Sequence, residues 1–496
     1  MKNKLSFLKD VKGMVIMSLQ FYNVLHRKKE KFIPLEEGKV KMYACGITAS
    51  GEAHIGHAYQ AIVFDVIKKY LEYIGYDVTY VRNYTDVDDK IIIKARELGV
   101  NPTDYANDMM KKIDKELKSL FIEKPTIQSK ATECIPDMIK FIKKLIDKGC
   151  AYSTENGDVF FRVSTFKEYG KLSNRTIEDN ISGVRKEVEP GKEDDKDFAL
   201  WKNAKNDEIW WESPWGKGRP GWHIECSTMS MKYLGETIDI HGGGKDLIFP
   251  HHENEICQSE SLTGKTFSNY WIHNGLIKIN GQKMSKSLNN GILVKDLLKK
   301  YNPEAIRMTL IANSYRSDIN IVDGLFEIYE AKTYELYKFL KEVSEFEKDY
   351  TLNNNSNYYK EIDTKFKEAM DNDFNTSVAL SNLFEYHTIT NKLIRKGNLQ
   401  EVVDIKYALI NIYKVLGLLT QKPETVINNI KNKYLKQNKI NEKEINELIS
   451  KRKQYKLDKN YAEADKVRDE LSLKGILIKD KGEETTWDID LTTKQN

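Results

Sequence analysis

The chain has 496 residues, 40% of them hydrophobic and 31% charged, with a formal net charge of +4 at pH 7. This length predicts about two to four domains with hydrophobic cores. No apolar run approaches the roughly 18 residues of a membrane span, and residues 14–25 lack the cleavage site of a secretory signal. Five cysteines, an odd number, argue against a disulfide framework. We therefore expect a cytoplasmic protein with no membrane partner.

The N-terminal part predicts a strand, a helix and a second strand in succession. Polar and apolar residues alternate over 39–45, as expected for a strand. Over 54–74 the apolar residues fall near one face of a helix, and Gly75 ends that helix. Strand alternation returns over 77–82. This order is typical of a Rossmann-like α/β domain built on a parallel sheet.

A long insertion is expected to separate the two halves of this α/β domain. Residues 102–149 have helical patterns, and residues 152–163 predict a hairpin around an Asn-Gly pair, a strong turn signal. The strand pattern of the α/β domain resumes only at 238–241 and again at 270–279. We therefore place the insertion at about residues 105–220.

From residue 318 onward, strand patterns are expected to disappear until the last unit of the chain. Helical patterns at 324–346, 362–395 and 401–419 predict a bundle. A helix followed by a strand within 460–480 predicts a small α+β unit at the end of the chain. The expected parts are an N-terminal extension (1–16), a Rossmann-like domain (17–317), a helical bundle (318–425), a polar linker (426–441) and a C-terminal unit (442–496).

Positive charge is concentrated near the C-terminus. Residues 421–480 contain 15 Lys and Arg against 10 Asp and Glu. This local excess suits a polyanionic partner. A solvated, Lys-rich surface explains the same charge, so composition alone leaves both interpretations open.

Four short motifs stand out, and the first and last combine residues suited to phosphate. His54 and His57 lie at positions i and i+3 near a predicted helix start, where unpaired N–H groups and the helix dipole favour anions. Lys283 and Lys286 lie on a loop after a predicted strand and can hold pyrophosphate as point charges. Alone, either pair is more simply interpreted as capping or surface residues. The motifs are His-Ile-Gly-His (54–57), Gly-Trp-His-Ile-Glu-Cys (221–226), Phe-Pro-His-His-Glu-Asn-Glu (249–255) and Lys-Met-Ser-Lys-Ser (283–287).

In this order the four motifs resemble those of class I aminoacyl-tRNA synthetases. The two middle motifs, together with Cys45, resemble the cysteinyl-tRNA synthetases in particular, and the resemblance extends over about residues 22–487. It implies ATP-dependent ligation of L-cysteine to tRNA(Cys) through a cysteinyl-adenylate, with ATP used together with Mg²⁺. It also implies a monomer whose helical bundle and C-terminal unit bind tRNA. One local departure is Tyr59-Gln60, which follows Ala58 where Arg-Thr is frequent in the family.

The resemblance also implies roles for individual residues. Catalytic roles fall on His54, His57, Lys283 and Lys286. Contacts with ATP fall on His54, Gly56, His57, Gly242, Gly243, Gly244, Asp246 and Lys286. The pocket for cysteine is expected to contain Gly46, Thr85, Trp222 and His251. Anticodon contacts fall on Lys456, where an arginine is usual, and on Asp465, Asp480 and Trp487.

The resemblance further implies one Zn²⁺ per chain with four ligands, which are Cys45, Cys226, His251 and Glu255. Two thiolates, an imidazole and a carboxylate suit tetrahedral zinc. His251 and Glu255 are four residues apart, hence on one helix face. A pocket that reads only shape separates cysteine from serine by about 1–3 kcal/mol, whereas zinc binds a thiolate far better than a hydroxyl. His241 and His252 are expected to surround the ligands or contact the substrate.

Two other functions compete with this interpretation. A ligase that activates cysteine and transfers it to a small amine shares the motifs but lacks most of the tRNA-binding tail, which is present here beyond residue 318. A non-catalytic RNA-binding relative is expected to have lost His57, Lys286 or a zinc ligand, and all of these are present. The synthetase interpretation is therefore favoured.

Overall fold

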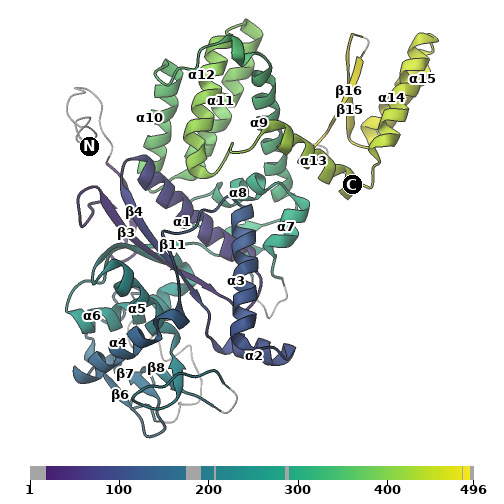
Figure 1. Ribbon diagram of the computed structural model, residues 1–496. Coiled ribbons are helices and arrows are strands. Elements are labelled where there is room, and N and C mark those ends of the chain that lie inside the picture. Colours follow the sequence, from purple (N-terminus) through teal and green to yellow (C-terminus); the bar gives the residue numbers. More distant parts are fainter. Residues whose placement is uncertain (1–17, 175–190, 206–207, 285–289, 483, 492–496) are drawn as a thin grey trace.

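The computed structural model describes residues 18–174, 191–205, 208–284, 290–482 and 484–491 (Figure 1). Its centre is a five-stranded sheet in which all neighbouring strands are parallel. In spatial order the strands are β11 (Ser268–Asn274), β10 (Ile238–Gly244), β3 (Lys39–Thr48), β4 (Asp77–Thr85) and β5 (Ile127–Lys130). A parallel sheet flanked by helices confirms the predicted α/β class.

Helix α1 (Ile55–Tyr73) connects β3 to β4 and confirms the predicted strand–helix–strand unit. His54 is its N-cap, and Ile62 and Val66 on its inner face are buried. Gly75 follows the helix with a φ of 103°, a conformation that favours glycine. Because the sheet is parallel, the carboxyl ends of its strands meet at one edge. Open α/β sheets bind their ligands at this edge.

A separate four-stranded antiparallel sheet contains the predicted hairpin, whose Gly157 has a φ of 92°. The insertion is expected to begin near residue 105, but β5 pairs with β4 in the central sheet, so the separate sheet begins only at residue 151. β5 reads Ile-Gln-Ser-Lys, and an edge strand this short and polar gives no alternating signal. The strands of the separate sheet are β6 (Ala151–Ser153), β7 (Val159–Phe161), β8 (Phe198–Asn203) and β9 (Gly218–Pro220).

The predicted helical bundle is present, but the helix expected over 362–395 is divided in two. Asp373 and Phe374 lie at the break with positive φ values of 67° and 49°. The Asp373 carboxylate accepts hydrogen bonds from the backbone N–H of Tyr22 and from the hydroxyl of Tyr315, both at 2.9 Å. These tertiary contacts stabilise a break that helical periodicity does not reveal. The helices are α8 (Pro303–Ile311), α9 (Leu325–Phe346), α10 (Asn357–Asp371), α11 (Thr376–Lys396) and α12 (Leu399–Tyr413).

Two boundaries of the bundle also differ from the sequence-based expectation. Strands continue past residue 318, because β14 (Ile319–Ile321) pairs with β12 (Ile277–Ile279). The expected linker over 426–441 belongs largely to helix α13 (Pro423–Gln437). Val426, Ile427 and Ile430 form the buried stripe of α13, while its Asn residues are exposed. A polar composition conceals a helix that packs along a single narrow stripe.

The C-terminal unit combines two helices with a hairpin, as expected, and projects beyond α13 from the rest of the molecule (Figure 1). None of the helices in the described part of the chain is long and apolar enough to span a bilayer. The unit contains α14 (Glu442–Leu457), α15 (Tyr461–Leu473), β15 (Ile476–Lys481) and β16 (Glu484–Ile489). Other elements are β1 (Gln20–Asn23), β2 (Lys28–Lys31), α2 (Asp89–Leu98), α3 (Pro102–Ser119), α4 (Ile135–Asp147), β13 (Gln282–Lys283) and α7 (Val294–Lys300).

A buried ion pair joins the central domain to the bundle. Arg307 of α8 is fully buried, and its guanidinium donates to the carboxylate of Asp65 in α1. The same guanidinium donates to the carbonyl of Leu120 at 3.1 Å and to the carbonyl of Leu416. One side chain therefore ties together α1, the end of α3 and the turn after α12.

Replacing Arg307 with methionine should lower the free energy of unfolding by about 3 kcal/mol, because one buried carboxylate and two carbonyls lose a donor. Arg316→Met is the matched control, since Arg316 is 38% exposed in its ion pair with Asp373 and its loss should cost about 1 kcal/mol or less. The first urea transition of each full-length variant measures the change. Equal losses in both variants would contradict this role for Arg307.

Candidate active site and metal centre

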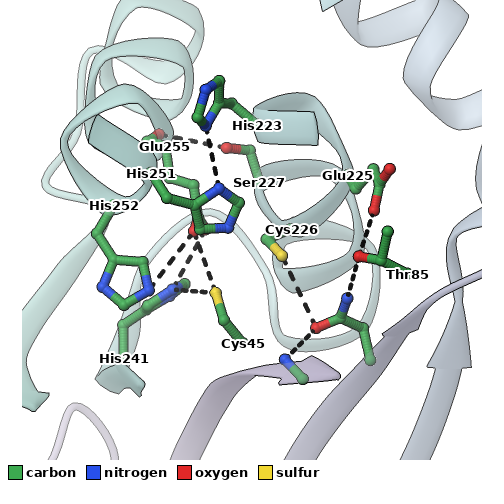
Figure 2. Close-up of polar contacts among 12 residues, drawn as sticks. Cys45, Thr85, His223, Glu225, Cys226, Ser227, His241, His251, His252 and Glu255 are labelled. Atoms are coloured by element: carbon green, nitrogen blue, oxygen red, sulfur yellow. Dashed lines mark hydrogen bonds and ion pairs between the residues drawn. The ribbon is translucent and has the colours of Figure 1, made fainter. Parts of the chain in front are cut away.

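Cys45 lies in a β-bulge near the carboxyl end of β3. Regular pairing with β4 stops at Ala44 and resumes at Ile47, with one residue fewer on β4. Cys45 and Gly46 therefore oppose the single residue Asn83, which is the arrangement of a bulge. A bulge changes the direction of a side chain, and the Cys45 thiol here points toward α6 (Glu253–Thr263) (Figure 2).

The four predicted metal ligands converge from separate elements (Figure 2). Cys226 lies in α5 (Trp222–Leu234), His251 in the turn Ile248–His252, and Glu255 in α6. Glu255 Oε1 lies 3.2 Å from Cys45 Sγ and 3.1 Å from His251 Nε2. Single ligand atoms of the four residues all lie within 4.8 Å of one another, and all four residues are buried.

Burial sets the charge of this cluster. Burial raises the pKa of the Cys45 thiol well above its usual value, with the neighbouring Cys226 and Glu255 adding to the effect, and burial also raises the pKa of Cys226. Burial lowers the pKa of His251 well below its usual value, which keeps the imidazole neutral and able to bind a metal. A divalent cation would offset the cost of ionising the thiols. The ligand types, their spacing and their burial fit a tetrahedral metal site.

Two aromatic residues of α5 fix the orientation of His251. The Nδ1 atoms of His223 and His251 lie 3.0 Å apart, within hydrogen-bonding distance, and His251 Nε2 faces Glu255. A partner on the second ring nitrogen holds a metal-binding imidazole in place. Trp222 stacks on His251 with ring centroids 4.2 Å apart. Sequence reasoning gave His223 no role, although its place three residues before Cys226 puts both side chains on one face of α5.

His241 and His252 lie beside the four ligands, as the sequence interpretation proposed. His241 Nε2 is 3.6 Å from Cys45 Sγ, and His241 and His252 form a second buried group that shares Cys45 and Glu255. His252 Nδ1 is in turn 2.7 Å from a ring nitrogen of His273. The ligands are thus enclosed by imidazoles on the side of β10.

His54 and His57 cap α1 as a reciprocal pair. The Nδ1 atom of each ring accepts from the backbone N–H of the other residue at 3.4 Å. The rings stack with centroids 3.5 Å apart. The pair therefore occupies the helix N-terminus that the sequence predicts, where the helix dipole favours an anion.

Met284 of the last motif and the nearby Ile292 lie close to the first motif. The backbone N–H of Ile55 donates to the carbonyl of Ile292 at 2.9 Å. A Cβ atom on Gly56 would lie 3.3 Å from the Cε atom of Met284, so glycine permits this close approach. Met284 and Ile292 therefore border the N-terminus of α1, while Ser285 to Ser287 of the last motif lie outside the described residues.

The remaining residues predicted to contact ATP lie on different elements. The three glycines 242–244 complete β10, which is expected to end at His241 but extends through Gly244. A Cβ atom on Gly242 would lie 2.2 Å from the carbonyl oxygen of Ile272, so glycine permits tight packing of neighbouring strands. Asp246 follows in a short 3₁₀ turn. Lys283 is exposed on β13, and Lys286 lies outside the described residues.

A polar network connects Gly46 and Thr85 of the predicted cysteine pocket, while Trp222 of that pocket stacks on His251. Thr85 donates from Oγ1 to the Glu225 carboxylate at 2.7 Å (Figure 2). Asn83 accepts from the Gly46 N–H at 2.8 Å and donates to Thr85 Oγ1 at 3.5 Å. Burial raises the pKa of Glu225 well above its usual value. Sequence reasoning missed Asn83 and Glu225 because the contacts of Asn83 with Gly46 and of Glu225 with Thr85 join residues that are distant in the chain.

The four predicted anticodon residues all lie in the C-terminal unit. Asp480 accepts from the Arg452 guanidinium at 2.9 and 3.1 Å and from Lys456 at 3.2 Å. The Arg452 hydrogen bonds hold the pKa of Asp480 well below its usual range. Asp465 is exposed on α15, and the Trp487 ring lies 4.5 Å from the ammonium group of a lysine of α13. Lys456 and Asp480 thus form one ionic cluster.

Comparison with known proteins identifies the family to which the chain belongs. The family model of the class I (C) tRNA synthetase catalytic domain matches residues 31–331, and the model of the DALR domain matches residues 365–420. The structure of Mycobacterium tuberculosis methionyl-tRNA synthetase in complex with methionyl-adenylate is similar in fold, with a TM-score of 0.57, 15% identity, and coverage of 79% of this chain and 93% of that chain. Fold and motifs together define a class I aminoacyl-tRNA synthetase.

Two full-length relatives specify the amino acid. The chain is 44% identical to the cysteine–tRNA ligase of Geobacter metallireducens, covering 95% of this chain and 100% of the relative. It is 46% identical to that of Francisella tularensis subsp. novicida, covering 94% and 99%. The chain belongs to the cysteine–tRNA ligase family of class I aminoacyl-tRNA synthetases.

Proposed function

We propose that this enzyme activates L-cysteine with ATP and transfers the cysteinyl group to tRNA(Cys). A carboxylate oxygen of cysteine attacks the α-phosphate of ATP, and pyrophosphate leaves to give the cysteinyl-adenylate. A ribose hydroxyl at the end of tRNA(Cys) then attacks the cysteinyl carbonyl, and AMP leaves. The observation that carries this proposal is the buried Cys45–Cys226–His251–Glu255 cluster, which the Gln60 hydrogen bond to the Cys45 carbonyl links to α1, the helix capped by His54.

The phosphate end of the reaction falls to the N-terminus of α1 and the lysine motif. His54 and His57 place donors where negative charge increases on the α-phosphate, and donors fixed in advance lower the barrier. Gly56 leaves room for a planar base against the backbone. Lys283 and Lys286 neutralise the departing pyrophosphate, which ATP brings as its Mg²⁺ complex.

Selection of cysteine falls to the buried cluster. Cys45, Cys226, His251 and Glu255 hold one zinc ion in this proposal. When bound, zinc lowers the pKa of a thiol and binds the thiolate in preference to the hydroxyl of serine. A pocket that reads only shape would separate cysteine from serine poorly. Sites that bind a polar group of the substrate directly reach a discrimination of roughly 10⁴–10⁵-fold. Trp222 stacks on His251 and borders the substrate side of this cluster.

Recognition of tRNA(Cys) falls to the C-terminal unit. The excess of Lys and Arg within residues 421–480 lies mainly on and around α13, just before this unit, and supplies phosphate contacts that weaken with salt. Asp465 and Trp487 offer an exposed carboxylate and an aromatic face to unpaired anticodon bases. Asp480 holds Lys456 at 3.2 Å, so the pair acts on the anticodon as one unit.

Purified enzyme should contain one zinc ion per chain, and Cys226→Ser should lose most of it, because a serine hydroxyl does not ionise near neutral pH. Elemental analysis measures both proteins. Cys134→Ser is the matched control, since the Cys134 thiol is equally buried but lies outside the cluster, and it should keep its zinc. Undiminished zinc in Cys226→Ser would remove Cys226 from the ligand set.

Lys286→Ala should slow adenylate formation by about 100-fold or more, because Lys286 acts on charge that develops in the transition state. Its dissociation constant for cysteine should change by less than about threefold. Pre-steady-state kinetics separate the two effects, and Lys265→Ala, at a side chain that is 62% exposed, serves as control. A normal activation rate with weakened cysteine binding is the opposite of what this role requires.

Asp465→Ala should raise the KM for tRNA(Cys) by about tenfold, as expected for loss of one base contact, with little change in kcat. Cysteine-dependent ATP–pyrophosphate exchange should be unchanged, because the catalytic domain is intact. Asp469→Ala, one turn further along α15 and also exposed, is the control and should charge tRNA(Cys) normally. An unchanged KM for tRNA in Asp465→Ala would exclude Asp465 from the anticodon site.

A further inference from the structure

We propose that two amide side chains, Asn83 and Gln60, clamp the peptide bond between Cys45 and Gly46 and thereby position the Cys45 thiol for metal and substrate. The inference rests on the proposed function, since it concerns the same metal and the same cysteine. Neither amide belongs to a predicted ligand or pocket set.

The clamp holds both polar groups of one peptide unit. Gln60 of α1 donates from Nε2 to the Cys45 carbonyl at 2.5 Å. Asn83 of β4 accepts from the Gly46 N–H at 2.8 Å. This peptide lies in the bulge, where Cys45 and Gly46 have no partner residues in the β3–β4 pairing. Side chains thus replace the ladder hydrogen bonds that a regular strand would make.

The orientation of the Asn83 amide is fixed by the direction of its hydrogen bonds. Its oxygen must face the Gly46 N–H, so its NH₂ group faces Thr85 and donates to Thr85 Oγ1 at 3.5 Å. Thr85 donates onward to Glu225 at 2.7 Å (Figure 2). Asn83 is 1% exposed, and a donor-to-acceptor chain in such a place leaves the amide one orientation.

Asn83 also joins the two thiol ligands. Its Oδ1 atom, which holds the peptide after Cys45, lies 3.7 Å from Cys226 Sγ. Its main chain restricts the bulge as well, since a Cβ atom on Gly46 would lie 1.6 Å from the Asn83 carbonyl oxygen. One residue of β4 therefore fixes Cys45 on β3 relative to Cys226 on α5.

Without the clamp, the bulge can relax toward regular pairing. Side chains alternate between the two faces of a strand, so a shift of one residue would turn Cys45 away from Glu255 and His251. Residues that orient metal ligands typically contribute about 10- to 100-fold in metal affinity. Gln60 belongs to α1, the helix capped by the phosphate motif, so the clamp also ties the metal cluster to the ATP end of the site.

The test compares zinc affinity in three full-length variants, measured by competition with a chelator of known zinc affinity. Asn83→Ala and Gln60→Ala should each raise the zinc dissociation constant by about 10- to 100-fold. Asn302→Ala is the control: Asn302 is also 1% exposed, it caps α8 far from the cluster, and its variant should bind zinc as the wild type does. Because Gln60 is only partly buried, Gln60→Ala decides the question if Asn83→Ala does not fold.

A kinetic readout separates positioning from general damage. Asn83→Ala should raise the KM for cysteine in pyrophosphate exchange by at least about tenfold, while the KM for ATP stays within about twofold. Wild-type zinc affinity in either folded variant overturns the clamp. Absence of zinc from the wild-type enzyme overturns the proposed function instead, so the two failures are distinguishable.

Discussion

The electrostatic cost of burying two thiols and a carboxylate in one place determines the protonation state of the functional site. Cys45, Cys226 and Glu255 come from three elements, and each is at most 2% exposed. Burial alone keeps the thiols protonated, so the cluster favours anions only when a cation lies among them. In the function proposed above, such a cluster discriminates by charge, because a bound metal would stabilise a substrate that becomes an anion on it and not one that stays neutral.

The same segment of chain serves both halves of the chemistry. β3 carries Cys45, and the loop after it leads directly to His54 at the start of α1. In a parallel sheet the loops that follow the strands all lie at the same edge, so Cys45 and His54 lie near each other. Cys45 in the bulge and His54 at the start of α1 are thus close neighbours in the chain, and Gln60 of α1 also hydrogen-bonds to the Cys45 carbonyl. This proximity suits a reaction in which the amino acid must meet the α-phosphate in a fixed geometry.

The bundle and the C-terminal unit contact the rest of the molecule in different ways. Arg307 is buried between the central domain and the bundle and satisfies one carboxylate and two carbonyls, so this junction cannot slide without leaving buried polar groups unpaired. The C-terminal unit instead meets the body through α13 and the contacts of Asp488 with Tyr334 and Lys338. A catalytic body with a projecting unit suits the tRNA binding proposed above, in which the catalytic domain holds the acceptor end and the C-terminal unit holds the anticodon.

The sequence by itself determined the α/β class, the strand–helix–strand unit around α1 and the four residues of the buried cluster. The first two follow from periodicity, which is a local property, whereas the four cluster residues follow from the resemblance that the order of the motifs carries. The tertiary structure decided the rest. β5 joined the central sheet, and the expected linker became α13, because edge strands and narrow helical stripes carry weak local signals. Asn83, Gln60, His223 and Glu225 acquired partners far away in the chain, and a hydrogen bond between residues distant in sequence leaves no periodicity from which it can be predicted.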